Sequence, residues 1–273
     1  MATTETGQST ESADDDSPSL LALVKVVFYK QYVLFVRYPI NTASLLLTLI
    51  TFFTLIFFGG RAIAGPSLSD SLNGIIVGFF LFTLSITSYS GLAWNVTHEA
   101  QWGTLERLFM SPHGFGTIMA VKSVVNICFS FFWGGVLLVF MMATTGRWLT
   151  IDPLTIVPLL ALTLMSVVGI GFFFAGLALV YKRIENLFQI VQFAFVGLIA
   201  APAGEVEALK LLPVTHGSHL TQRAMQDSLR LWEFQPTEIG LLVATSVIYL
   251  VIGYYSFYRS GIKARKNGLL GHY

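Results

Sequence analysis

The sequence predicts an all-α membrane protein with six transmembrane helices, an N-terminal interfacial amphipathic helix, a short cytoplasmic helix after the second span and short extracellular helices before the last span. Composition is the first observation, because 54% of the 273 residues are hydrophobic and only 11% are charged, against roughly 25% charged in a soluble domain. The mean hydropathy is +0.70. The second observation is six apolar stretches, each close to the about 20 residues that cross a bilayer. The net charge of +1, without a basic run, does not support nucleic-acid binding.

Residues 1–18 differ in composition from the rest of the chain. They hold five acidic residues and no basic one, so they lack the positive start of a secretory signal peptide. We expect a disordered, solvated acidic tail followed by one membrane domain over residues 19–273. The single cysteine, Cys128, lies in an apolar run and is interpreted as a small packing residue.

The predicted spans are the most apolar parts of residues 19–273, and none contains Asp, Glu, Lys or Arg. They cover about residues 41–59, 72–94, 123–144, 154–180, 187–203 and 239–258. The fifth is the shortest, because Pro202 and Gly204 close it early.

Residues 19–38 are apolar as well, but we expect them to lie on the membrane surface. Lys25, Lys30 and Arg37 would each cost about 2.5–3.5 kcal/mol near the bilayer centre. Lys30 and Arg37 share one face of a helix, as an interfacial helix requires. Pro39 ends that helix at the residue before it.

The distribution of lysine and arginine predicts the orientation. With the N-terminus inside, eleven of these residues fall in inner segments and five in outer loops. The positive-inside rule therefore favours both termini in the cytoplasm.

The stretch "HEAQWGTLERLFMSP", residues 98–112, is an unusually polar insert between two spans. Thr97 is a candidate N-cap, and Trp102, Leu105 and Phe109 recur at helical spacing. The pattern predicts a short amphipathic helix along the cytoplasmic membrane surface, ended by Pro112. From spacing alone, an ordinary surface helix anchored by Trp102 and Phe109 is the simpler interpretation.

Three stretches in order resemble the permeases of ABC-2 type transporters. "EAQWGTLERLFMSPHGFGTIMAVK", residues 99–122, resembles the loop between their second and third spans. "LLPVTHGSHLTQRAM", residues 211–225, resembles the segment after their fifth span, and "ARKNGLLGHY", residues 264–273, resembles their C-terminal tail. The resemblance covers roughly residues 19–273 and implies the transmembrane subunit of an exporter in a prokaryotic plasma membrane.

In that family the loop after the second span is a coupling helix, which docks on a separate ATP-hydrolysing subunit. The resemblance places this contact at Glu99, Gly103, Thr104, Leu105, Glu106 and Arg107, with an additional cytoplasmic contact at Lys182, Arg183 and Glu185. It implies two copies of the ABC ATPase subunit and a second permease copy or paralogue. One departure is the pair Gln101 and Trp102, where the family pattern is more polar.

The chain has no ATPase site of its own in its sequence. A phosphate-binding loop needs G-x-x-x-x-G-K-[ST], and the nearest match, "GFGTIMAVKS", has Val121 in place of the second glycine. We therefore expect no enzyme activity and no cofactor on this chain, with ATP and Mg bound by the partner.

Metal binding has weak support. The insert begins like the zinc motif H-E-x-x-H, but Trp102 replaces the second histidine. His216 and His219 could share a metal, but no third ligand is evident.

The spans also limit the cargo. They lack the ionisable residues that mark ion-coupled pathways. Gln189 and Gln192 are the best candidates for a substrate path, although hydrogen bonding between helices or to the backbone is the simpler explanation of each. Gly169, Gly171 and Gly176 suit close helix approach. We expect a hydrophobic or amphipathic cargo, which is drug-like, a lipid or a glycan.

Two other classes of protein remain as alternatives. An ATP-independent secondary carrier or channel would work without any partner. An intramembrane enzyme would need a catalytic pair at depth, which the sequence does not offer.

Residues 205–238 form a long, patterned outer loop. They predict two short helices, the second starting at a Thr215 cap and reaching Leu231. Such a segment is either a gate over the pathway, as in the resembled family, or a solvated helical hairpin.

Overall fold

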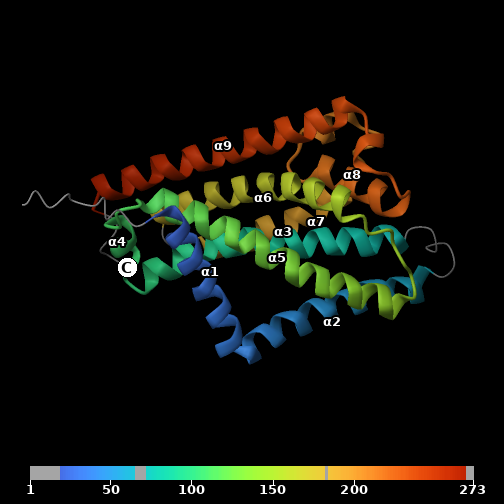
Figure 1. Cartoon of the computed structure of the whole chain (residues 1–273), viewed down its shortest axis with the longest axis horizontal. Helices are drawn as coiled ribbons and strands as arrows, with labels where there is room; N and C mark the ends of the chain where they lie inside the picture. The colour runs from blue at the N-terminus through green and yellow to red at the C-terminus, as the bar shows by residue number, and fades with distance from the viewer. Residues whose placement is uncertain (1–18, 65–71, 182–183, 269–273) are drawn as a thin grey trace, which may run out of the picture.

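The computed structural model describes residues 19–64, 72–181 and 184–268, and these residues form helices and loops without a strand. Four long helices run along the length of the molecule: α3 (Leu72–Gln101), α5 (Phe115–Thr145), α6 (Pro153–Tyr181) and α9 (Pro236–Lys266) (Figure 1). A fifth, α2 (Pro39–Ala64), diverges from this bundle. In the described part, these five helices are long and apolar enough to cross a membrane. The predicted class, an α-helical membrane protein, is confirmed.

The predicted fifth span, residues 187–203, is shorter than expected. It corresponds to α7 (Glu185–Ala200), which has 16 residues and is therefore about 24 Å long, less than the about 30 Å of a hydrocarbon core. Ala201 has extended backbone angles, φ −64° and ψ 134°, because the residue before Pro202 avoids the helical region. Within the described ranges, five helices rather than six have spanning length.

The second predicted span ends too early and the third begins too late. α3 continues past residue 94 to Gln101, and α5 begins at Phe115 instead of residue 123. The predicted N-cap at Thr97 is wrong, because Thr97 is buried inside α3 and its Oγ1 donates to the carbonyl of Ala93 at 3.5 Å. A fall in hydropathy does not end a helix, since the backbone hydrogen bonds continue until a stop signal appears.

The N-terminal helix α1 (Leu20–Arg37) has the predicted bounds. Ser19 caps it by accepting the N–H of Ala22 at 3.2 Å. α1 is steeply inclined to the long helices (Figure 1), and Phe28 and Phe35 pack on Phe129 and Trp133 of α5 at ring distances of 5.2 and 5.0 Å. No residue of α1 is buried, which suits a helix that leaves one side to lipid headgroups.

Glycines let α6 approach its neighbours closely, as predicted. A Cβ added to Gly253 of α9 would lie 1.9 Å from the carbonyl oxygen of Gly169, so the two backbones touch there. A Cβ on Gly176 would meet Cα of Phe257 at 3.0 Å, and one on Gly171 would meet Leu92 of α3 at 3.2 Å. Only residues without a side chain permit this α6–α9 crossing.

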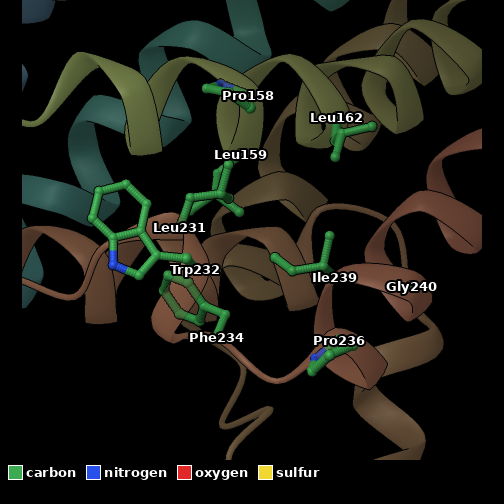
Figure 2. A pocket seen from close by; sticks show the side chains of 9 residues that line it. All are labelled: Pro158, Leu159, Leu162, Leu231, Trp232, Phe234, Pro236, Ile239 and Gly240. Atoms are coloured by element: carbon green, nitrogen blue, oxygen red, sulfur yellow. The ribbon is translucent and has the colours of Figure 1, made fainter.

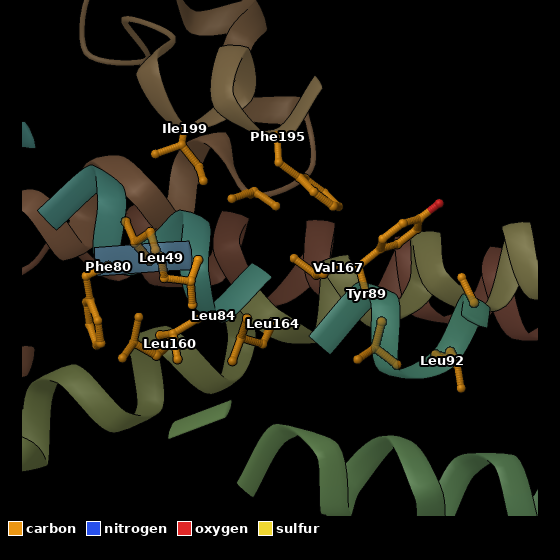
Figure 3. Close-up of a cluster of buried hydrophobic side chains, with 14 of the residues drawn as sticks. Leu49, Phe80, Leu84, Tyr89, Leu92, Leu160, Leu164, Val167, Phe195 and Ile199 are labelled. Atoms are coloured by element: carbon orange, nitrogen blue, oxygen red, sulfur yellow. The ribbon is translucent and has the colours of Figure 1, made fainter. Parts of the chain in front are cut away.

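In the part that Figure 3 shows, the apolar core joins α2, α3, α6 and α7, and it also includes residues of α5 and α9. Its labelled members are Leu49, Phe80, Leu84, Tyr89, Leu92, Leu160, Leu164, Val167, Phe195 and Ile199. α3 packs against α5, α6 and α7 and is, with α6, the most buried of the five spanning helices. The loop that follows α3 is therefore attached to a helix in the centre of the bundle.

The predicted outer segment packs against the opposite end of the molecule from the loop after α3 (Figure 1). It contains two 3₁₀ turns, η2 (Glu207–Leu211) and η3 (Leu231–Glu233), around the helix α8 (Thr215–Gln226). The prediction of one helix from Thr215 to Leu231 is wrong, since α8 ends at Gln226 and its N-cap is Val214. Most of α8 is buried, so the segment is not a solvated hairpin.

An apolar pocket of about 540 Å³ lies at this end (Figure 2). Trp232 and Phe234, from the chain between α8 and α9, line it together with Pro158 of α6 and Ile239 of α9. It lacks the convergent polar groups of a specific ligand site.

The two histidines of α8 have a structural explanation. Burial lowers the pKa of His216, which favours the neutral ring, and its Nε2–H donates to the carbonyl of Glu238 at 2.9 Å. Burial also lowers the pKa of His219. No group of three metal-ligating side chains occurs among the residues described.

Candidate functional site

The motif Gly103–Thr104 ends α3 and starts the loop. Gly103 has φ +69°, its N–H donates to the carbonyl of Ala100 at 3.1 Å, and the Thr104 N–H donates to the carbonyl of Glu99 at 3.0 Å. These are the two hydrogen bonds of a Schellman motif, in which glycine occupies the left-handed position after a helix. The chain consequently reverses at Gly103 and leads into the short helix α4 (Leu105–Phe109).

Glu99 is the centre of a polar cluster beneath this turn. Its carboxylate is buried, and its Oε1 lies 2.8 Å from Nζ of Lys122 in α5 and 3.8 Å from Nζ of Lys30 in α1. Oε2 accepts the hydroxyl of Thr104. Lys122 is buried as well, whereas Lys30 is mostly exposed. The cluster connects α1, the end of α3, the loop and α5 through the buried carboxylate of Glu99, which needs these partners.

Apolar contacts hold α4 on the bundle. Leu105 is buried, and the ring of Phe109 stacks on Phe115 at 4.1 Å. Arg265, near the end of α9, lies over Phe109 at 4.7 Å and donates to its carbonyl at 3.4 Å. α4 therefore contacts α3, α5 and α9.

The side of this loop that faces away from the helix bundle is exposed. Trp102 is 69% exposed and Met110 is 76% exposed, and Gly103, Glu106 and Arg107 are also exposed. These five residues are called the loop surface below. Trp, Met and Arg are enriched in protein interfaces. Here they lie on or next to α4, whose other side packs against the bundle.

The predicted contact residues thus divide into two groups. Gly103, Glu106 and Arg107 belong to the loop surface, whereas Glu99, Thr104 and Leu105 lie under it and hold it. Of the additional set, Glu185 begins α7 and accepts Gln101 Nε2 at 3.5 Å. Lys182 and Arg183 lie outside the described residues.

Gln189 and Gln192, the residues predicted to line a substrate path, do not lie at the loop. Gln189 is exposed and Gln192 is half-buried, both farther along α7. Their contact with a substrate stays a prediction.

The roles of Lys30 and Lys122 were not predicted. Lys30 was interpreted as part of the charged face of an interfacial helix, and both lysines as positive charges on the inner side. The sequence held one indication of this ion pair. Glu99 and Lys122 lie next to apolar spans, and a charged side chain that becomes buried there needs a partner of opposite charge.

Comparison with protein-family models gives no match, and comparison with curated proteins gives none either. The function therefore has to be argued from the residues and their geometry.

Proposed function

We propose that this chain is the permease subunit of an ABC-2 type exporter and that its loop surface docks on a separate ATPase subunit. One observation carries the proposal: an exposed loop surface lies on a turn and a short helix that are attached to α3, α5 and α9. The attachments are the Thr104–Glu99 hydrogen bond, the Phe109–Phe115 stacking and the Arg265–Phe109 contact. A motor that pulls on this loop would tilt α3, α5 and α9. A loop that merely connects two spans needs no such attachment.

The proposed orientation in the membrane rests on the charges at the end of the molecule that holds α4. α1, α4 and the end of α9 lie together, as the contacts Lys30–Glu99 and Arg265–Phe109 indicate. Most of the positive charge predicted to be inside is at this end, so we assign it to the cytoplasm of a prokaryotic plasma membrane. α7, with the chain that follows it, would complete the sixth crossing.

The assembly contains a second permease copy or paralogue and two ATPase subunits that bind ATP and Mg. α2 supports the second copy, because it is the least buried of the five spanning helices and exposes Phe52, Leu55 and Phe58. The cargo is hydrophobic or amphipathic, in keeping with spans that lack ionisable residues along most of their length.

Replacing both Glu106 and Arg107 with alanine is expected to reduce retention of the ATPase subunit at least about tenfold, since central interface residues commonly contribute 1.4 kcal/mol or more. The measurement is ATP hydrolysis that co-purifies with the tagged chain in mild detergent from its native cells. Glu207→Ala with Lys210→Ala is the matched control, because it removes the same charges from η2 at the opposite end. Equal retention by both double variants would remove the loop surface from the interface.

A further inference from the structure

A hollow of about 700 Å³ lies between α1, α2, α3 and α5, a size typical of ligand sites. It extends along α3 from Ile86 to His98, which is about 18 Å at the rise of an α-helix. His98 is close to the loop end of α3, and Ile86 lies deeper in the spanning region. The hollow therefore has about the depth of one leaflet of the about 30 Å hydrocarbon core.

The hollow has polar but uncharged groups in its lining. Asn41 of α2, Asn95 of α3 and Asn126 of α5 line it, and none of its described lining residues is Asp, Glu, Lys or Arg. Thr87 Oγ1, also in the lining, donates to Ser130 Oγ at 2.9 Å. Polar side chains at membrane depth face a partner or a cavity, and they mark ligand pathways.

Asn126 has an unused hydrogen-bonding group. Its Nδ2 is buried against Gly91, where an added Cβ would lie at 2.3 Å, and finds no acceptor among the described residues. Rotation about the last side-chain bond exchanges the amide nitrogen and oxygen. Asn126 can therefore offer the hollow a donor or an acceptor, and a ligand would offset the cost of the unpaired group.

The lining also includes aromatic residues, which lead into an apolar groove. Phe35, Phe129 and Trp133 line both the hollow and a neighbouring groove of about 380 Å³ between α1 and α5. The groove also includes Phe28 and Phe132. A polar, uncharged space thus continues directly into an apolar one.

We propose that this hollow binds an uncharged amphipathic molecule with a hydroxyl- or amide-bearing head group, such as a neutral glycolipid. The head group contacts Asn95 and Asn126 beside the buried Ser130, whose Oγ donates to the Asn126 carbonyl, and the hydrocarbon chain lies along Phe35, Phe129 and Trp133. A charged head group would lose its hydration without an opposite charge in the lining. As the class of exported cargo, this assignment rests on the proposed function, but binding itself does not require the ATPase.

The test uses the purified chain in phosphatidylcholine nanodiscs without an ATPase. Three photoreactive probes carry the same diazirine-bearing alkyl chain and differ in the head group, which is a glucoside, a carboxylate or a trimethylammonium. The glucoside is expected to label α1 and α5 peptides of the hollow at least about tenfold more efficiently than either charged probe, and unlabelled alkyl glucoside should compete. Equal labelling by all three probes, or preference for a charged one, would overturn the proposal.

Variants locate the site. Asn126→Leu and Ser130→Ala should each weaken glucoside labelling about tenfold or more, whereas Thr144→Val, an exposed isosteric change on α5, should not alter it. Elution volume and thermal midpoint show that each variant is folded. Unchanged labelling in a folded Asn126→Leu and a folded Ser130→Ala would also overturn the proposal. Because no ATPase is present, a failure here leaves the docking of the ATPase untouched, and the reverse also holds.

Discussion

Gly253→Ala is expected to lower the free energy of unfolding by about 1–3 kcal/mol, the cost of overpacking a tight contact. The added Cβ would lie 1.9 Å from the carbonyl oxygen of Gly169, which is backbone and cannot rotate away. α6 and α9 would have to separate along their whole contact. A chemical unfolding series of the purified protein in mixed micelles measures the change.

Gly240→Ala is the control on the same helix. A Cβ at Gly240 meets nothing within 4 Å, so the exchange should be neutral or stabilising by about 0.5–1 kcal/mol, the ordinary advantage of alanine in a helix. Equal effects at the two positions would mean that α6 and α9 do not cross where described.

Glu99→Gln is expected to destabilise the protein by about 3–5 kcal/mol, the usual cost of breaking a buried ion pair from one side. The amide keeps the shape of the side chain and can still accept from Thr104, but the ammonium group of Lys122 stays buried without its carboxylate. The loss should appear as a lower midpoint in the same unfolding series. Transport should fall as well, because the end of α3 beneath the loop surface loses its ion pair to α5.

Adding Lys122→Met to Glu99→Gln should recover much of that stability, since both buried charges are then removed. Glu106→Gln, an equivalent change at an exposed position of α4, should stay within about 0.5 kcal/mol of the original protein. If Glu99→Gln were as mild as Glu106→Gln, the buried cluster would not hold the loop.

The spanning helices could be predicted because they depend on composition, which is local. Apolar runs placed both ends of α6 within one residue, and the starts of α2 and α9 within three residues, of the observed positions. α2 and α9 extend five and eight residues past their predicted ends, at 59 and 258. Pro39 and Pro202 marked real helix ends. The errors arose where the sequence becomes polar but the helix continues. Gly103 was the true stop signal for α3, and the glycine was visible in the sequence.

The arrangement around Glu99 could not be predicted in the same way. Lys30 and Lys122 lie far from Glu99 along the chain, and only the packing of α1 and α5 on α3 brings them together. Several other lysines and arginines on the predicted inner side were equal candidates. The hollow beside α3 likewise depends on the angle between α1 and the bundle, which composition does not determine.

The central claim is that a separate ATPase subunit docks on the loop surface, and cross-linking from position 107 tests it most directly. The photoreactive residue p-benzoylphenylalanine replaces Arg107 in the native cells, with the same replacement of Lys210 in η2 as the control. The account predicts that position 107 cross-links to a protein that binds ATP through a G-x-x-x-x-G-K-[ST] loop, and that position 210 does not. No such adduct at position 107, together with transport by the purified chain alone in vesicles, would contradict the account and favour an ATP-independent carrier.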